Sequence, residues 1–172
     1  MFYLDTDVIL SYSFATRGDE HLRAVSLIEK IEGSKFYASP FTILELYCAV
    51  SRDINKYKLP SPTFRKQKGE IKVKMAIEYA IRSLNLTVCS DDITNKEVEW
   101  LGIKVFSRYF DAIKLAPKVK LRTGDTLHVA YACQLKKEGK IEYIVSLDND
   151  FQEKEVLIER ETGIKLLQSD LR

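Results

Sequence analysis

The chain has 172 residues, 45% of them hydrophobic and 30% charged, which is typical of one globular domain and excludes a disordered chain. Its three cysteines, Cys48, Cys89 and Cys133, have no CxxC spacing, which argues against a disulfide framework and a zinc site. The first residues lack a signal-peptide pattern, and no apolar run approaches the roughly 18 residues of a membrane span. We therefore expect a cytoplasmic protein that does not enter a membrane.

The net charge of +2 is unevenly distributed along the chain. The segment from Arg52 to Lys74 has eight basic and two acidic residues and carries +6, so the remainder carries −4. A basic segment beside an acidic remainder suits a site that must hold both phosphates and cations.

The first half of the chain alternates short apolar runs with helical periodicity. In chain order we predict a strand at 2–4, a helix at 20–31, a strand at 35–38 and helices at 41–50 and 70–84. The first strand meets Asp5, so a carboxylate stands at its carboxyl end. Ser39 and Pro40 form a typical N-cap and first-turn pair ahead of the helix at 41–50.

The second half continues the alternation. In chain order we predict a strand at 86–89, a helix at about 97–106, a helix at 123–137 and strands at 143–147 and 164–167. The prediction of the helix at 97–106 depends on Thr94 and Glu97, which have the spacing of a capping box. Trp100, Tyr109 and Phe110 have helical spacing and are interpreted as packing residues. The alternation predicts a single α/β domain over residues 1–172, with a mostly parallel sheet of four to five strands flanked by helices.

Acidic residues fall where such a fold would bring them together, because functional groups gather at the carboxyl ends of parallel strands. Asp5 and Asp148 follow predicted strands, Asp125 follows an expected helix cap at Thr123, and Glu45 stands among apolar neighbours. Converging carboxylates repel one another unless a cation compensates, and oxygen ligands suit Mg²⁺ or Mn²⁺. Each residue alone has an ordinary alternative as a turn former, a helix cap or a solvent-facing side chain.

Four segments resemble, in order, the motifs of the PIN-domain nucleases, a family that includes the VapC-like toxins of toxin–antitoxin systems. They are LDTDVIL (4–10), SPFTILELY (39–47), GDTLHVAYA (124–132) and IVSLDNDF (144–151). The resemblance implies a twisted parallel sheet flanked by helices and a metal-dependent ribonuclease that uses Mg²⁺ or Mn²⁺. It implies catalytic, metal-binding carboxylates at Asp5, Glu45, Asp125 and Asp148, a supporting metal ligand at Asp150, and orienting hydroxyls at Thr6 and Ser146.

The implied reaction is hydrolysis of RNA phosphodiester bonds without a covalent nucleophile, leaving 5′-phosphate and 3′-hydroxyl ends. One departure is Asp7, where the family often has Asn, so an extra negative charge is expected to alter metal affinity. His128 lies one helical turn after Asp125 and can approach the site, although a structural histidine is the simpler interpretation.

The basic helical segment at about 52–84 appears longer than in compact members of the family. Its candidates for RNA contact are Arg52, Lys56, Lys58, Arg65, Lys66 and Lys68. The interleaved Tyr57 and Phe64 are candidates for stacking on unpaired bases. A solvated helix face or an antitoxin-binding surface remains an alternative, and apolar and aromatic residues of the middle helices are compatible with a homodimer.

Other functions stay open at this point. The LDTDVI segment also resembles the DxD motif of haloacid-dehalogenase-like phosphatases, although Val8 and Ile9 stand where that family usually has a threonine. A non-catalytic RNA-binding or interaction module has no use for a costly carboxylate cluster. A structure-specific DNA nuclease would be unusual in so short a chain.

Overall fold

The computed structural model describes residues 1–14, 18–57, 62–91 and 97–168, with the backbone alone at residues 62 and 65. Within these residues the main sheet has five strands. They are β1 (Phe2–Leu4), β2 (Phe36–Ala38), β3 (Thr87–Val88), β6 (Tyr143–Val145) and β7 (Lys165–Leu167). The strand order is β3-β2-β1-β6-β7, and every neighbouring pair is parallel. The predicted α/β fold with a parallel sheet of four to five strands is confirmed.

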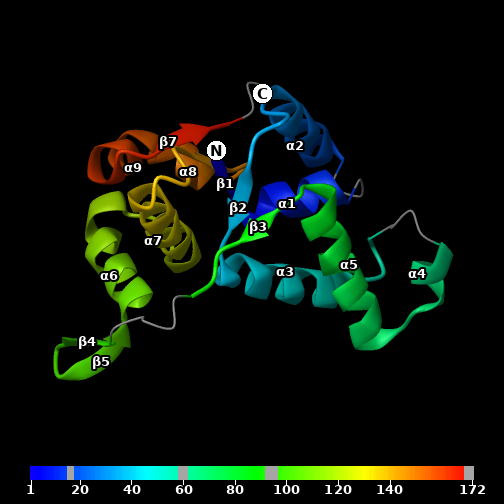
Figure 1. Ribbon diagram of the computed structural model, residues 1–172, viewed down its shortest axis with the longest axis horizontal. Coiled ribbons are helices and arrows are strands. Elements are labelled where there is room, and N and C mark those ends of the chain that lie inside the picture. Colours follow the sequence, from blue (N-terminus) through cyan, green and yellow to red (C-terminus); the bar gives the residue numbers. More distant parts are fainter. Residues whose placement is uncertain (15–17, 58–61, 92–96, 169–172) are drawn as a thin grey trace.

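Helices cover both faces of this sheet (Figure 1). One group consists of α1 (Thr6–Ser13), α2 (Asp19–Lys30), α3 (Pro40–Asp53) and α5 (Gly69–Ser83), with the short α4 (Pro62–Lys66) ahead of α5. The other group consists of α6 (Ser107–Val119), α7 (Thr123–Lys137), α8 (Asn149–Glu153) and α9 (Glu155–Thr162). None of the helices in the described part of the chain is long and apolar enough to cross a membrane.

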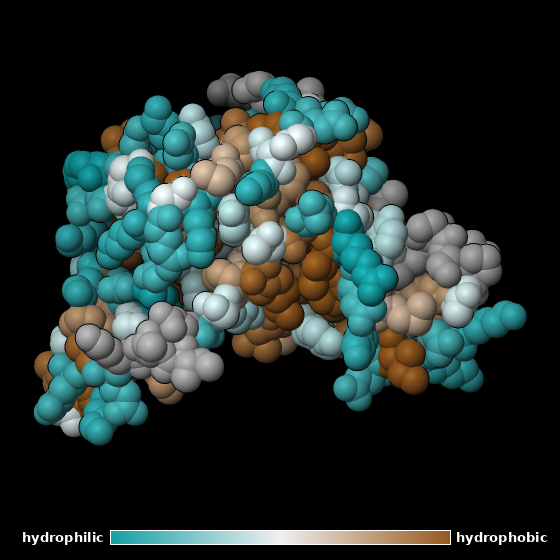
Figure 2. Space-filling model, viewed as in Figure 1, coloured by the Kyte–Doolittle hydropathy of each residue, from teal (hydrophilic) through white to brown (hydrophobic). Residues whose placement is uncertain are grey.

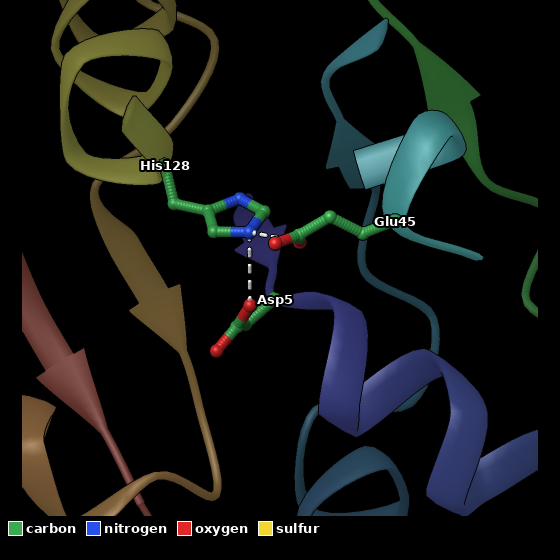
Figure 3. Close-up of side chains that lie close together, drawn as sticks. All are labelled: Asp5, Glu45 and His128. Atoms are coloured by element: carbon green, nitrogen blue, oxygen red, sulfur yellow. Dashed lines mark hydrogen bonds and ion pairs between the residues drawn. The ribbon is translucent and has the colours of Figure 1, made fainter. Parts of the chain in front are cut away.

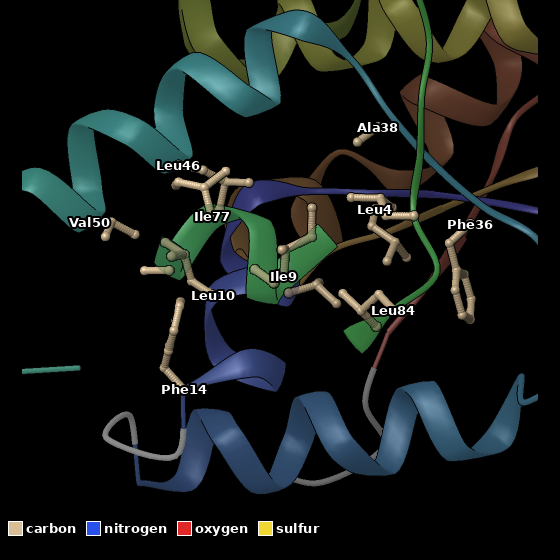
Figure 4. Close-up of a cluster of buried hydrophobic side chains, with 14 of the residues drawn as sticks. Leu4, Ile9, Leu10, Phe14, Phe36, Ala38, Leu46, Val50, Ile77 and Leu84 are labelled. Carbon is tan, nitrogen blue, oxygen red and sulfur yellow. The ribbon is translucent and has the colours of Figure 1, made fainter. Parts of the chain in front are cut away.

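The alternation of side chains along the central strands divides the core into two clusters. Leu4 of β1 and Val145 of β6 belong to the cluster formed with α1, α2, α3 and α5, part of which is drawn in Figure 4. The preceding residues of the same strands, Tyr3 and Ile144, belong to the cluster formed with α6, α7 and α9. Both faces of these strands are therefore buried, as in other parallel sheets.

Local capping explains where α3 begins. The side chain of Ser39 accepts a hydrogen bond from the backbone N–H of Thr42, the Thr42 side chain accepts one from Ser39, and Pro40 occupies the first turn. The predicted N-cap and proline pair is confirmed. The expected cap at Thr123 is wrong, because Arg122 is the N-cap residue of α7 and Thr123 already lies in the helix.

The helix predicted at about 97–106 is wrong. Residues 97–106 form an antiparallel hairpin of β4 (Glu97–Trp100) and β5 (Ile103–Phe106), and Thr94 of the expected capping box lies outside the described residues. Leu101 and Gly102 connect the strands with φ values of 51° and 74°, as a two-residue hairpin turn requires. The turn and the alternation of the two strands therefore prevail over the local capping pattern.

Of the residues interpreted as helical packing residues in this region, Trp100 and Tyr109 are exposed and Phe110 is half-buried. The exposed apolar side chains of the hairpin and the start of α6 are Trp100, Leu101, Ile103, Phe106 and Tyr109. Figure 2 shows apolar and polar residues side by side over the hairpin. The interpretation of Trp100 and Tyr109 as packing residues is wrong, because both are exposed.

On helix α3, Glu45 of the expected site is flanked by two leucines that differ in burial. These two leucines allow a matched test of which face of the helix packs in the core. Leu46 is fully buried, whereas Leu44 on the same helix is 58% exposed. We expect Leu46→Ala to lower the free energy of unfolding by about 2–4 kcal/mol because it leaves a cavity. Leu44→Ala should change it by less than about 0.5 kcal/mol. Urea unfolding of both variants measures the difference, and equal losses would contradict the assignment of the core face.

Candidate active site

The expected site lies at the carboxyl ends of β1 and β6. From β1 the chain order proceeds to β2 and β3 on one side, whereas β6 and β7 join on the other side. The carboxyl ends of strands at such a switch point form a crevice. A pocket of about 280 Å³ opens here, and its lining includes Asp5, Glu45, Asp125 and Asp148. The four carboxylates expected from the sequence therefore stand around one cavity.

Asp5 is held by backbone and side-chain donors at the end of β1. Its Oδ1 accepts a hydrogen bond from the backbone N–H of Thr6 at 2.6 Å, so Asp5 also caps α1. Its Oδ2 accepts one from Ser146 Oγ at 2.9 Å, and that hydroxyl oxygen accepts one from the backbone N–H of Asp148 at 3.1 Å. The two strand ends are thus tied together, with Ser146 as the link.

Glu45 of α3 points toward Asp5 and His128 (Figure 3). Its Oε2 accepts hydrogen bonds from His128 Nε2 at 2.7 Å and from Thr6 Oγ1 at 2.5 Å. His128 Nε2 also lies 3.3 Å from Asp5 Oδ1. Burial acts to raise the pKa of Glu45, but the hydrogen bonds and the charge of His128 outweigh it, so that pKa lies below its usual value. Glu45 is therefore ionised and oriented.

His128 is almost completely buried, and both of its ring nitrogens have partners. Nδ1 lies 2.8 Å from the hydroxyl oxygen of Tyr3, which donates a hydrogen bond to Ser39 Oγ. Burial disfavours the charged ring, but the charge of Asp5 and the hydrogen bond to Glu45 outweigh burial and raise the pKa of His128. His128 is a satisfied histidine, and it also belongs to the site.

Asp125 lies in the first turn of α7 and combines burial with repulsion. Its Oδ2 is buried and has no hydrogen-bond partner among the described residues. Burial and the charges of Asp5 and Asp148 raise its pKa to about 6. The neighbouring Gly124 lets α7 lie close to Glu45 of α3, since a Cβ at this position would stand 3.3 Å from Glu45 Oε1.

Asp148 and Asp150 both form ion pairs with Arg122, a residue of the site that the sequence analysis missed. Arg122 Nη2 lies 3.0 Å from Asp148 Oδ2, and Arg122 Nε lies 2.9 Å from Asp150 Oδ2 and 3.6 Å from Asp125 Oδ2. Its position three residues before Asp125, at the start of the helix, was a signal in the sequence. An arginine three residues before an aspartate at the start of a helix lies close to that aspartate. That Arg122 also contacts the carboxylates after β6 depends on the fold.

The acidic residues therefore form two adjoining groups, each with its own basic partner. Asp5 and Glu45 stand around His128, and one ligand atom from each of the three lies within 4.8 Å of the others. Asp125, Asp148 and Asp150 stand around Arg122. Asp7, whose extra charge is expected to alter metal affinity, lies in the first turn of α1 and also lines the pocket.

Among the described residues of the basic segment, Arg52 lines the pocket. This residue lies near the end of α3, and its side chain is 74% exposed. Lys56 is exposed and forms an ion pair with Asp53 at 2.6 Å. Lys66 and Lys68 are also exposed, whereas Lys58 and the side chain of Arg65 lie outside the described residues.

The expected stacking role of Tyr57 and Phe64 is wrong. Tyr57 is 7% exposed and Phe64 is 2% exposed, and both belong to the core cluster of α1, α3 and α5. The Tyr57 ring lies 4.6 Å from that of Phe14. The apolar rings of the basic segment therefore stabilise the fold and are not available to bases.

The raised pKa of Asp125 predicts a pH-dependent gain in stability for Asp125→Asn in metal-free buffer. The Asp125 carboxyl binds its proton more tightly in the folded wild type than in the unfolded chain. Ionisation of Asp125 therefore lowers the free energy of unfolding of the wild type as the pH rises from about 4 to about 6. We expect the variant to be more stable by on the order of 1–2 kcal/mol at pH 8 and to lose this advantage toward pH 4.

Urea unfolding between pH 4.5 and 8, with a chelator present, measures this effect. Asp19→Asn is the matched control, because Asp19 is exposed on α2. A variant Asp125→Asn that is less stable than the wild type at pH 8 would contradict the repulsion inferred from the structure.

Comparisons with known proteins agree with this geometry. The family model described as PIN domain matches residues 2–157. Among solved structures, "VapBC2 from Rickettsia felis bound to a DNA fragment from their promoter" has a similar chain, with 13% identity and a TM-score of 0.52 over 99% of this chain and 100% of that chain. "FitAB bound to IR36 DNA fragment" is similar with 14% identity and a TM-score of 0.53, over 97% and 94% of the two chains.

At these identities the structural likeness shows the fold alone, and no curated protein matches the sequence. The family model covers nearly the whole chain, including all four carboxylate-bearing segments. The protein therefore belongs to the PIN domain family.

Proposed function

We propose that this protein is a metal-dependent endoribonuclease that hydrolyses RNA phosphodiester bonds. The observation that carries the proposal is the pocket in which carboxylates from four separate segments meet, namely Asp5, Glu45, Asp125 and Asp148. Membership of the PIN domain family supports a nuclease. The phosphatase alternative loses its basis, because the family that matches is a different one.

The residues of the pocket fit a divalent cation. Asp125 Oδ2 is buried without a hydrogen bond to any described residue, and it belongs to a carboxylate whose pKa is raised by burial and by its acidic neighbours. An orphaned, repelled oxygen of this kind is explained if a cation normally neutralises it. Asp5, Glu45 and Asp125 would hold one ion, with Asp148 and Asp150 completing the site. Carboxylate oxygens suit Mg²⁺ or Mn²⁺.

A bound divalent ion would supply an activated water near neutral pH and neutralise the charge that develops on the phosphate. The residues of the chain prepare the site for this chemistry. Ser146 and the Thr6 N–H fix the two oxygens of Asp5, while Thr6 Oγ1 and His128 Nε2 fix Oε2 of Glu45. Because these partners are largely buried, the carboxylates keep one orientation, which preorganises the site.

Basic side chains beside the acidic pocket support a substrate with a phosphate backbone, which we propose is RNA. Arg52 lines the pocket, and Lys56, Lys66 and Lys68 add positive charge along the same segment. Such residues contact phosphates without reading the sequence. With Tyr57 and Phe64 in the core, the proposed contact is electrostatic and does not involve base stacking by these two rings.

We further propose that the protein is the toxin of a toxin–antitoxin pair, with an antitoxin as protein partner. The support is the fold shared with the chains of VapBC2 and FitAB. A homodimer is part of the same proposal and is tested by the mass of the purified protein in solution.

The function is tested by RNA cleavage with Mg²⁺ or Mn²⁺. We expect Asp5→Asn and Asp125→Asn each to reduce the cleavage rate by at least about 100-fold, because each removes a charge needed at the cation and the transition state. Asp19→Asn should cleave at the wild-type rate, and a chelator should abolish cleavage by the wild type.

Circular dichroism and thermal unfolding of each variant separate loss of catalysis from loss of folding. Cleavage that persists in both folded variants would show that the catalytic centre lies elsewhere. RNA binding without cleavage, equal with and without Mn²⁺, would favour the alternative of a non-catalytic RNA-binding module.

A further inference from the structure

Arg122 is placed so that one guanidinium faces three acidic side chains of the pocket edge. Nη2 lies 3.0 Å from Asp148 Oδ2, while Nε lies 2.9 Å from Asp150 Oδ2 and 3.6 Å from Asp125 Oδ2. Asp150, Asp125 and Asp148, in that order, also raise the pKa of Arg122, so its charge is permanent. The guanidinium thus stands as the counter-ion of this half of the site.

The ion pairs of Arg122 are weak enough for its side chain to move away from the carboxylates. The Arg122 side chain is 69% exposed, and it belongs to the N-cap residue of α7, outside the regular helix. Ion pairs of exposed side chains stabilise proteins only slightly, since water and salt compete for both partners. Arg122 also leaves the arrangement incomplete, because the buried Asp125 Oδ2 is within 3.6 Å of the guanidinium yet accepts no hydrogen bond from it.

We propose that Arg122 is an intramolecular competitor of the divalent cation at Asp125, Asp148 and Asp150. In the metal-free protein the guanidinium neutralises these carboxylates, and it withdraws toward solvent when a cation enters. Arg122 therefore sets the metal concentration at which the site fills. This inference rests on the metal dependence of the proposed function and adds a residue that holds no metal itself.

The physical consequence is a change in metal affinity whose sign is opposite to that of losing a ligand. Removing a ligand weakens metal binding, whereas removing a competing positive charge strengthens it. One unit charge several ångströms from a divalent ion in a water-exposed site changes the affinity by about tenfold. Because the charges are exposed, the change should shrink as the salt concentration rises.

The experiment measures Mn²⁺ binding to the purified full chain by isothermal titration calorimetry, with no RNA present. We expect Arg122→Gln to bind Mn²⁺ about tenfold more tightly than the wild type and to unfold at a lower temperature before metal is added. Arg122→Lys should lie between the two, because a single ammonium cannot bridge three carboxylates. It also serves as the test if Arg122→Gln does not fold.

Arg160→Gln is the matched control, since Arg160 on α9 is 63% exposed and paired with Glu161. It should bind Mn²⁺ as the wild type does. Equal or weaker Mn²⁺ binding by Arg122→Gln, with the wild type binding normally, overturns the competition and leaves the proposed function standing. If neither the wild type nor the variant binds Mn²⁺ at millimolar concentration, the proposed metal dependence fails, and the competition fails with it.

Discussion

Carboxylates crowded at one edge of the sheet are the constraint on which the rest of the structure depends. Asp5, Glu45, Asp125 and Asp148 line a single pocket, and Asp150 stands next to them through its contact with Arg122. Negative charges this close destabilise one another, and burial adds a desolvation cost. The surrounding side chains are arranged to offset both effects.

The compensation is uneven across the two groups. Asp5 and Glu45 are well satisfied, because His128, Thr6 and Ser146 donate hydrogen bonds to them or lie within ion-pair distance. In the other group Asp148 accepts a hydrogen bond from the backbone N–H of Asp150 and contacts the exposed Arg122, whereas Asp125 keeps an oxygen without a hydrogen bond and a pKa of about 6. The first group is therefore held in place by its hydrogen bonds, while the second group carries the buried oxygen that the proposed cation would neutralise.

The group of Asp5, Glu45 and His128 is connected by hydrogen bonds to the buried core. The Tyr3 hydroxyl, completely buried in β1, contacts His128 on one side and Ser39 and Thr42 of the α3 cap on the other. The same network that starts α3 at Ser39 therefore also fixes the histidine that orients Glu45. Helix capping, strand position and site geometry are coupled in this chain, so a change in the buried network is expected to reach the carboxylates.

Much of the fold and the set of acidic residues could be predicted from the sequence, because both depend on local patterns. Apolar runs that end at Asp5 and Asp148 mark strand ends, and Ser39-Pro40 marks the start of α3. The hairpin at 97–106 was missed because a capping pattern and a hairpin turn compete over a few residues. In this chain the positive φ values at Leu101 and Gly102 accompany the hairpin.

By itself, the sequence determined the residue types, their order and the strand ends at which carboxylates would meet, since periodicity and capping act over a few residues. Only the tertiary structure decided which side chains face one another. It buried Tyr57 and Phe64 in the core, set His128 against Asp5 and Glu45, and brought Arg122 within reach of Asp148 and Asp150. These contacts join residues far apart in the chain, such as Glu45 and His128, which are 83 positions apart. They arise from the packing of α3 and α7 around the sheet, which no local pattern encodes.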